Sequence, residues 1–152
     1  MFVYSIYLGD KKSVSSFGNL LSKLLYPELI VFFVGNLGSG KTFLIKGIIG
    51  SLLKYKSDVK SPTYSLVETY NLSDFFIHHF DFYRLYKYDE LNDIDFNNYL
   101  RRDSLLLVEW GNRILNMACR SHINVYFFYY SNFFNRIFYL KSYFFNFKIL
   151  FG

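Results

Sequence analysis

The chain of 152 residues suits one domain, residues 1–152, and its 52% hydrophobic and 19% charged residues exclude a disordered tail. Its single cysteine, Cys119, excludes an internal disulfide and a cysteine-rich metal site, and it suits a reducing cytoplasm. The formal net charge of +5 arises in the section 110–152, which has no acid and contains Arg113, Arg120, Arg136, Lys141 and Lys148. This section is either a surface for tRNA or another polyanion, or an ordinary solvated face.

The first half of the chain predicts strands that alternate with helices. Phe2–Leu8 and Glu28–Val34 have the apolar character of strands, and the second run ends at a glycine. Between them, apolar side chains recur at helical spacing after two candidate N-caps, Asp10 and Ser13. A second amphipathic helix is expected after Lys41. No apolar run approaches the roughly 20 residues of a spanning helix, and no signal-peptide pattern is visible. We therefore expect a cytoplasmic protein that does not enter the membrane.

The second half predicts paired strands around one buried strand. The expected strands are Thr63–Tyr70, Phe75–Phe80, Ser104–Trp110, Ile123–Tyr130 and Arg136–Ser142. Asp89–Leu100 is expected to be helical, although its pattern is weak. Strands separated by helices and then joined as hairpins predict an α/β fold. Its sheet would be mixed, with a parallel centre, antiparallel flanking strands and helices on both faces.

A glycine-rich segment, Gly35–Thr42, matches the pattern G-x-x-x-x-G-K-[ST] in full, between an apolar strand and an amphipathic helix. Glycine lets the backbone adopt conformations that side chains forbid, so that several N–H groups can converge on phosphate oxygens. The positive end of the following helix dipole adds to this attraction. Lys41 supplies a cation for the terminal phosphates, and the Thr42 hydroxyl can bind the magnesium that accompanies a nucleotide. The pattern predicts a phosphate-binding loop.

Two acids are candidates for the carboxylate that magnesium on a phosphate requires. Glu109 ends the apolar run Leu105–Val108, and Asp81 ends a less regular run. We favour Glu109 for the metal and Asp81 for a second role, such as orienting water or ordering a switch segment. Either acid could instead cap a helix or form a salt bridge.

Two histidines and one tryptophan lie next to these acids. His78 and His79 are adjacent in an expected strand, so they point to opposite faces and cannot chelate one metal together. We interpret both as structural residues. Trp110 directly follows Glu109 and is expected to pack.

Four motifs follow one another in a recognisable order. They are Gly35–Thr42, Lys60–Val67, His79–Leu85 and Leu107–Trp110. Together, over roughly residues 10–113, the chain resembles the TsaE (YjeE) family, the bacterial ATPases of tRNA threonylcarbamoyladenosine synthesis. A P-loop alone would fit many families, whereas this set of motifs is specific.

The resemblance implies a small P-loop NTPase fold that binds ATP and Mg²⁺. It also implies two partners, the threonylcarbamoyl transferase TsaD and its companion TsaB. This complex modifies the adenosine beside the anticodon of tRNAs that read codons starting with A. ATP hydrolysis by the TsaE component would reset the complex between turnovers, without making the carbamoyl bond itself.

Site residues carry over from the family by motif position. Lys41 would be the phosphate clamp, and Thr42 and Glu109 would be the magnesium ligands. Asp81, which we expect to be a further catalytic residue, would begin a switch-like segment that runs to Arg84. The implied nucleotide-binding residues are Gly35, Asn36, Leu37, Gly38, Ser39, Gly40, Lys41, Thr42 and Phe43. The implied switch-like residues near the γ-phosphate are Ser61, Pro62, Thr63, Tyr64, Tyr83, Arg84 and Trp110.

The chain departs from the family pattern at two loop positions. Asn36 stands where the family usually has Asp, and Phe43 stands where it has a second Thr. Phe43 offers no hydroxyl to the α-phosphate, so we expect lower nucleotide affinity, although its backbone N–H remains. Beyond Arg113 the match fades, and no C-terminal contact carries over.

Three other function classes compete with the regulatory ATPase. A small-molecule kinase could use Arg101 and Arg102 as a lid, but it leaves the motifs around Ser61 and Glu109 unexplained. A regulatory GTPase would need an Asn-Lys-x-Asp segment, which the sequence lacks. A decayed binding module that does not hydrolyse nucleotide conflicts with the intact Lys41, Thr42 and Glu109.

Overall fold

A computed structural model describes residues 2–53, 59–85, 89–114, 121–129 and 136–142 of the chain. Several residues considered in the sequence analysis lie outside these ranges, namely Cys119, Arg120 and Lys148. Both interpretations of the basic C-terminal section therefore stay predictions. No helix in the described ranges combines the length and the apolar character that crossing a membrane requires.

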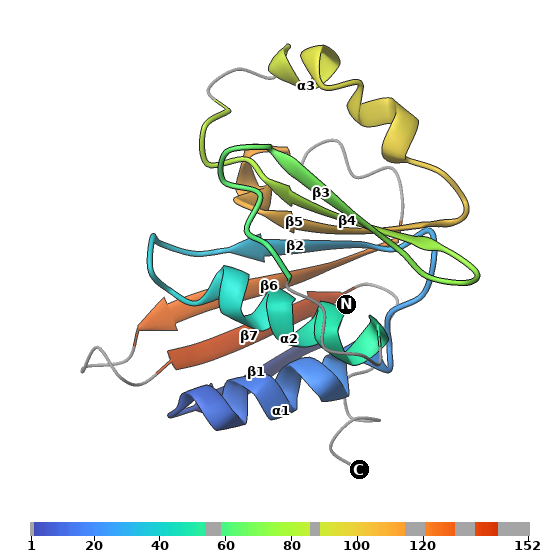
Figure 1. The fold of residues 1–152 in the computed structure, drawn as a ribbon. Coiled ribbons are helices and arrows are strands. Elements are labelled where there is room, and N and C mark those ends of the chain that lie inside the picture. Colours follow the sequence, from blue (N-terminus) through green and yellow to red (C-terminus); the bar gives the residue numbers. More distant parts are fainter. Residues whose placement is uncertain (1, 54–58, 86–88, 115–120, 130–135, 143–152) are drawn as a thin grey trace.

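Seven strands form one mixed sheet with the order β1-β7-β6-β2-β5-β4-β3 (Figure 1). The strands are β1 (Phe2–Leu8), β2 (Ile30–Val34), β3 (Val67–Asn71), β4 (Phe76–Asp81), β5 (Ser104–Glu109), β6 (His122–Tyr129) and β7 (Arg136–Ser142). The central strands β6, β2, β5 and β4 are parallel to one another. The pairs β1–β7, β6–β7 and β3–β4 are antiparallel. The predicted parallel centre with antiparallel flanks is confirmed.

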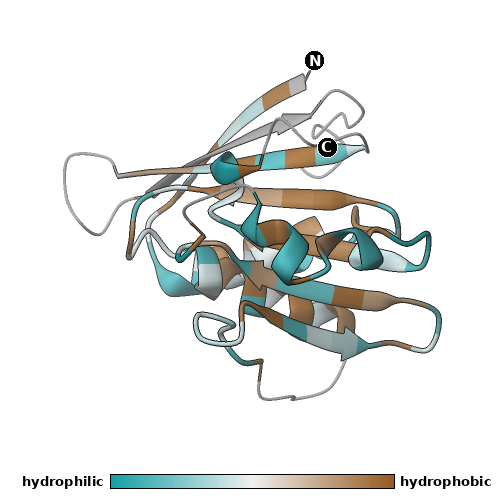
Figure 2. Ribbon diagram, turned by 90° about the horizontal axis from the view of Figure 1, so that it is seen from above, coloured by the Kyte–Doolittle hydropathy of each residue, from teal (hydrophilic) through white to brown (hydrophobic). Residues whose placement is uncertain are grey.

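Helices cover both faces of the sheet, as predicted, but unequally. The two long helices, α1 (Lys11–Ser22) and α2 (Lys41–Leu53), lie side by side on one face and share a large apolar cluster with it (Figure 1). The other face is covered by short pieces, α3 (Glu90–Asp93) and the 3₁₀ helices η1 (Phe96–Tyr99) and η2 (Gly111–Arg113). The two innermost strands, β2 and β5, are mostly apolar, and side chains on both of their faces are buried (Figure 2).

Helix α1 begins where the sequence predicts. The Asp10 side chain accepts a hydrogen bond from the backbone N–H of Ser13 at 2.7 Å, and the Ser13 hydroxyl accepts one from the Asp10 N–H. This capping box satisfies two backbone donors that the first turn leaves free. Further along, a Cβ on Gly18 would lie 3.3 Å from the backbone of Gly47 in α2, so the glycine allows the two helices to approach closely.

Two sequence predictions of local structure are wrong. The strand predicted over Thr63–Tyr70 begins only at Val67, because Pro62 and Leu66 close a turn in which the Leu66 N–H donates to the Pro62 carbonyl at 2.8 Å. Leu66 has a φ of 64°, which ends the turn. The residues of this turn therefore lie outside strand β3, beside the sheet.

The helix predicted over Asp89–Leu100 is broken at Asp95, whose φ is 50°. Leu91 and Phe96 are both buried in the apolar cluster on this face. Five residues apart on a continuous α-helix, they would point roughly 140° away from each other. The break lets both side chains reach the same cluster, and Asp is one of the few residues besides Gly that adopt a left-handed backbone with some frequency.

His78 joins three strands. Its Nδ1 contacts the Thr69 hydroxyl at 2.9 Å in β3, and its Nε2 contacts the Ser104 hydroxyl at 3.2 Å in β5. The ring also packs edge-on against Tyr99. The structural role predicted for this residue fits its contacts, which tie β3, β4 and β5 together.

His78 is expected to make the fold sensitive to mild acid. Burial lowers the pKa of His78, and the Asp103 carboxylate opposes that shift only in part. Below a pH of about 6.5, the pKa of an unperturbed His, the unfolded chain therefore binds more protons than the folded one, and stability falls as the pH falls. The contribution is at most about 1.4 kcal/mol per pH unit. Denaturant unfolding between pH 7.5 and 5 should show a shallower decline for His78→Gln than for the unsubstituted chain, and equal slopes would contradict this assignment.

Candidate nucleotide site

The P-loop lies at the edge of the sheet where the parallel strands end. It follows β2 and leads directly into α2, as the motif predicts. In the sheet register, Phe33 of β2 pairs with Glu109 at the end of β5, and Glu109 pairs with Asp81 at the end of β4. Both predicted acids therefore reach the loop, because the carboxyl ends of parallel strands share one edge of the sheet.

Glycines fix the shape of the loop. Gly38 and Gly40 have φ values of 74° and 100°, in the left-handed region that side chains disfavour. At Gly35, a Cβ would lie 2.7 Å from the Cβ of Phe127 in β6. Ser39 is buried, and its hydroxyl has no hydrogen-bond partner among the described residues. The backbone thus forms the compact turn that the glycine spacing predicts.

Lys41 folds back over the loop that precedes it. Its Nζ donates hydrogen bonds to the carbonyls of Gly35 at 2.9 Å and Asn36 at 3.0 Å. Only 4% of Lys41 is exposed, and this burial lowers the pKa of the ammonium, while the Glu109 and Asp81 carboxylates raise it. The cation is placed before any phosphate arrives, and an anionic group would repay part of its desolvation.

Trp110 does more than the packing that the sequence predicts. The Lys41 ammonium lies 4.1 Å from the centre of the Trp110 ring, within the range of a cation–π interaction. Trp110 has a φ of 58°, and Gly111 follows it because a Cβ there would lie 2.6 Å from the Cβ of Phe32. This tight bend after β5 turns the indole toward the loop, where the ring also contacts Tyr83.

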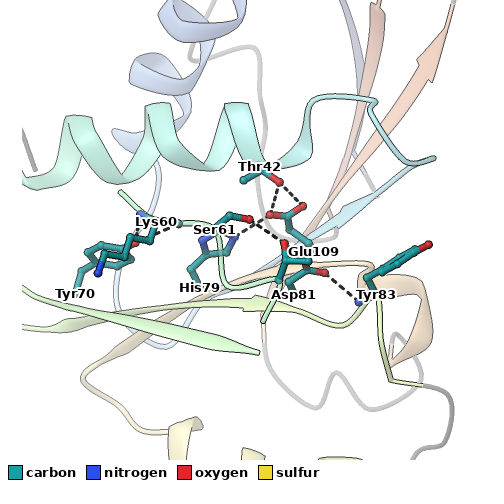
Figure 3. A network of polar contacts seen from close by, with 9 residues as sticks. Thr42, Lys60, Ser61, Tyr70, His79, Asp81, Tyr83 and Glu109 are labelled. Carbon is teal, nitrogen blue, oxygen red and sulfur yellow. Dashed lines mark hydrogen bonds and ion pairs between the residues drawn. The ribbon is translucent and has the colours of Figure 1, made fainter. Parts of the chain in front are cut away.

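The Thr42 hydroxyl and the Glu109 carboxylate meet at the floor of the site. The Thr42 Oγ1 lies 2.7 Å and 2.8 Å from the two carboxylate oxygens (Figure 3). On the other side, His79 Nε2 contacts Glu109 Oε1 at 2.9 Å. The two residues predicted to hold magnesium are therefore brought together. The interpretation of His79 as purely structural missed its contact with one of them.

Asp81 ties two loops to the edge of the sheet. One carboxylate oxygen accepts from the Thr63 hydroxyl at 3.0 Å and the other from the Tyr83 N–H at 3.0 Å (Figure 3). The Ser61 hydroxyl contacts that of Thr63 at 3.0 Å. Asp81 thus joins the two segments that the family resemblance implies to be switch-like. This geometry favours the ordering role for Asp81 over that of orienting water.

A pocket of about 350 Å³ opens above these groups. It is lined by Leu37, Gly38, Gly40, Lys41, Thr42, Phe43, Thr63, Asp81, Tyr83, Glu109 and Trp110. Four of the predicted switch-like residues line no part of it: Ser61, Pro62, Tyr64 and Arg84. Tyr64 is 85% exposed, and the Arg84 guanidinium lies 4.7 Å from the centre of its ring. These two side chains belong to the outer surface beside the site.

The oxygen ligands offered by Thr42 and Glu109 suit a magnesium ion that arrives bound to a nucleotide. Such an ion takes few ligands from the protein, because phosphate oxygens and waters supply the others. Within the described ranges, no group of three or more His, Cys, Asp or Glu side chains could hold a metal ion by itself. Thr42 and Glu109 instead offer oxygen ligands at the N-terminus of α2, next to the Lys41 cation. The residues present therefore match this group.

The parallel sheet, the glycine loop between β2 and α2 and the lysine folded over it define a protein of the P-loop NTPase fold. A family model described as "Threonylcarbamoyl adenosine biosynthesis protein TsaE" matches residues 8–133. The chain belongs to the TsaE family.

Similar proteins agree with this assignment. The tRNA threonylcarbamoyladenosine biosynthesis protein TsaE of Haemophilus influenzae is 37% identical over 112 residues, which cover 70% of each chain. The protein of the same name from Rickettsia felis is 34% identical over 120 residues, 79% of this chain and 70% of that one. The crystal structure of YdiB from Bacillus subtilis superposes with a TM-score of 0.73 at 19% identity, covering 97% of this chain and 90% of YdiB, and it supports the fold alone.

Proposed function

We propose that this chain binds ATP with Mg²⁺ and hydrolyses it, and that this hydrolysis resets the TsaD–TsaB transferase between rounds of tRNA threonylcarbamoyladenosine synthesis. The observation that carries the proposal is the contact between the Thr42 hydroxyl and the Glu109 carboxylate, at 2.7 Å and 2.8 Å, beneath a P-loop that Lys41 closes. Membership of a family described by threonylcarbamoyl adenosine biosynthesis supports the pathway.

Each residue of the site has a distinct task in this proposal. The backbone N–H groups of the loop and the N-terminus of α2 bind the phosphates. The Lys41 ammonium would leave the carbonyls of Gly35 and Asn36 and donate to the terminal phosphate oxygens instead. It would stabilise the negative charge that develops on them as water attacks the γ-phosphate. Thr42 and Glu109 would hold magnesium, which supplies further charge neutralisation on the phosphates when bound. Trp110 and Tyr83 line one side of the site and contact each other.

Slow hydrolysis by the isolated chain follows from the acids that line the pocket. Both oxygens of Asp81 already accept hydrogen bonds, from Thr63 and from the Tyr83 N–H. Glu109 accepts from Thr42 and His79. Within the described part of the pocket, no carboxylate is therefore left unengaged as a base for the attacking water. A partner that rearranges the Thr63 and Tyr83 segments would change this, so the rate should depend on the partner.

The fold does not support the kinase hypothesis in the form that uses Arg101 and Arg102 as a lid over the phosphates. Arg101 and Arg102 precede β5, whereas the P-loop lies where the parallel strands end. Arg101 also pairs with Asp103 at 2.9 Å. These arginines are therefore at the opposite edge of the sheet from the site, and a lid over the phosphates would have to come from elsewhere.

The test is phosphate release from ATP by the purified chain, alone and then with its cognate TsaD–TsaB heterodimer and tRNA. We expect slow release by the chain alone and stimulation by the heterodimer. Unchanged release with the heterodimer, together with turnover that appears only when a small acceptor molecule is supplied, would reject the regulatory ATPase in favour of a kinase.

A further inference from the structure

His79 occupies a position that packing alone does not explain. It is fully buried on the face of β4 that α1 and α2 cover, and it pairs with Leu107 of β5 in the sheet register. Its Nε2 contacts Glu109 Oε1 at 2.9 Å, and its Nδ1 has no hydrogen-bond partner among the described residues. A buried polar ring costs free energy unless it is hydrogen-bonded. Among the residues that the structure describes, the contact with Glu109 is the one hydrogen bond that offsets this cost.

The direction of this hydrogen bond follows from the acceptor. An ionised carboxylate has no proton to donate, so the ring must donate from Nε2. A neutral ring with its proton on Nε2 then leaves Nδ1 as a bare acceptor, and no N–H group is buried without a partner. His78, one residue earlier, differs because both of its nitrogens are engaged with hydroxyl groups of neighbouring strands.

The contact also has a consequence for the carboxylate. The single Thr42 hydroxyl proton is shared between Glu109 Oε1 and Oε2, at 2.7 Å and 2.8 Å, and His79 contacts Oε1 in addition. Glu109 is only 2% exposed and lines the pocket. Held at Oε1 from the core side, the carboxylate cannot rotate freely, and Oε2 retains more of its lone-pair capacity for a further ligand.

We infer that His79 is a positioning residue that orients the Glu109 carboxylate through Nε2–H, so that Thr42 and Glu109 are set to receive magnesium. This inference rests on the proposed function, in which magnesium arrives with ATP. Partners that orient a metal ligand from the outer shell typically change metal affinity or activity by about 10–100-fold when they are removed.

Two substitutions of His79 distinguish the effect of losing the hydrogen bond to Glu109 from the effect of a smaller side chain. In His79→Gln, the side-chain NH₂ lies at about the place of the ring Nε2 and can still donate to Glu109. In His79→Asn, the NH₂ lies at about the place of Nδ1, and the side chain is too short for this group to reach Glu109. His78→Gln is the matched control, because His78 is the neighbouring buried histidine on the opposite face of the same strand.

The measurement is ATP affinity, once in EDTA and once in magnesium. Binding is detected through the fluorescence of Trp110, the only tryptophan in the sequence. The ratio of the two affinities isolates the magnesium-dependent part of binding. We expect this ratio to fall about 10–100-fold in His79→Asn, and to stay near that of the unsubstituted chain in His79→Gln and His78→Gln. Affinity in EDTA should be unchanged in all three, since the loop and Lys41 are intact.

The outcomes separate this inference from the function on which it rests. An unsubstituted chain that binds ATP equally in EDTA and in magnesium overturns the proposed magnesium site and the inference with it. A normal ratio in His79→Asn, or equal losses in EDTA and in magnesium, overturns the inference alone. In the unsubstituted chain, a ¹⁵N–¹H histidine spectrum should place the His79 proton on Nε2, and a proton on Nδ1 alone would overturn it whether or not the variants fold.

Discussion

Replacing Lys41 by alanine is expected to abolish measurable phosphate release from ATP, with a loss of about 10²–10³-fold or more. The Nζ of Lys41 lies over the loop, within 3.0 Å of the carbonyls of Gly35 and Asn36. Alanine removes both the ground-state attraction for phosphate and the charge that stabilises the transition state. ATP affinity should therefore fall as well, in EDTA and in magnesium alike.

A matched control for this variant lies on the same helix. Lys46 is exposed and belongs to α2, five residues after Lys41. Lys46→Ala removes the same charge from the same helix and should leave phosphate release unchanged. Thermal unfolding of both variants checks the fold. Normal turnover by Lys41→Ala would overturn the assignment of the phosphate site.

Desolvation gives Lys41→Ala a second expected property. The buried ammonium is costly, as the lowered pKa of Lys41 indicates, and the nearby carboxylates of Glu109 and Asp81 compensate it only in part. Alanine removes that cost together with the two hydrogen bonds. We therefore expect a small change in stability and a large change in activity, the pattern of a residue kept for its chemistry.

Much of this site could be predicted because it follows from local rules. The glycines of the loop are demanded by backbone geometry, and Gly38 and Gly40 indeed have positive φ. Glu109 and Asp81 are acids at the ends of apolar runs, and parallel strands bring such ends to one edge. Only short-range patterns and one topological rule were needed for these residues.

The contacts that the sequence did not reveal depend on register between distant segments. His79 of β4 contacts Glu109 of the neighbouring strand β5. In the sheet register, however, His79 pairs with Leu107, which is two residues before Glu109. Period-two alternation could have placed His79 on the same face as Asp81, but it could not have supplied the offset to Glu109. The tilt of Trp110 onto Lys41 likewise depends on the bend at Gly111, which packing against Phe32 imposes. The break at Asp95 arose from burial in tertiary structure, which overrides a weak helical pattern.

Replacing Glu109 by alanine is expected to stop phosphate release while ATP binding in EDTA persists. Glu109 is the carboxylate that contacts the Thr42 hydroxyl, and its removal takes away one of the two side chains offered to magnesium. The expected loss of turnover is of the order of 10²–10³-fold. Phosphate release and the ratio of ATP affinities with and without magnesium are the measurements. Glu68→Ala is the control, because Glu68 is an acid of β3 that bonds to Ser65 and lies outside the pocket lining.

The comparison with Lys41→Ala makes this prediction sharp. Loss of the lysine should lower ATP affinity in EDTA, whereas loss of Glu109 should leave that affinity in place and remove only the magnesium-dependent increment. Glu109→Ala also leaves the Thr42 hydroxyl and His79 Nε2–H without an acceptor in a buried region, which costs about 1–3 kcal/mol of stability for each group. A destabilised chain that retained normal turnover would show that Glu109 only braces the core, and it would transfer the metal role to Asp81. A folded but destabilised chain that bound ATP in EDTA but gained nothing from magnesium would place the ion between Thr42 and Glu109.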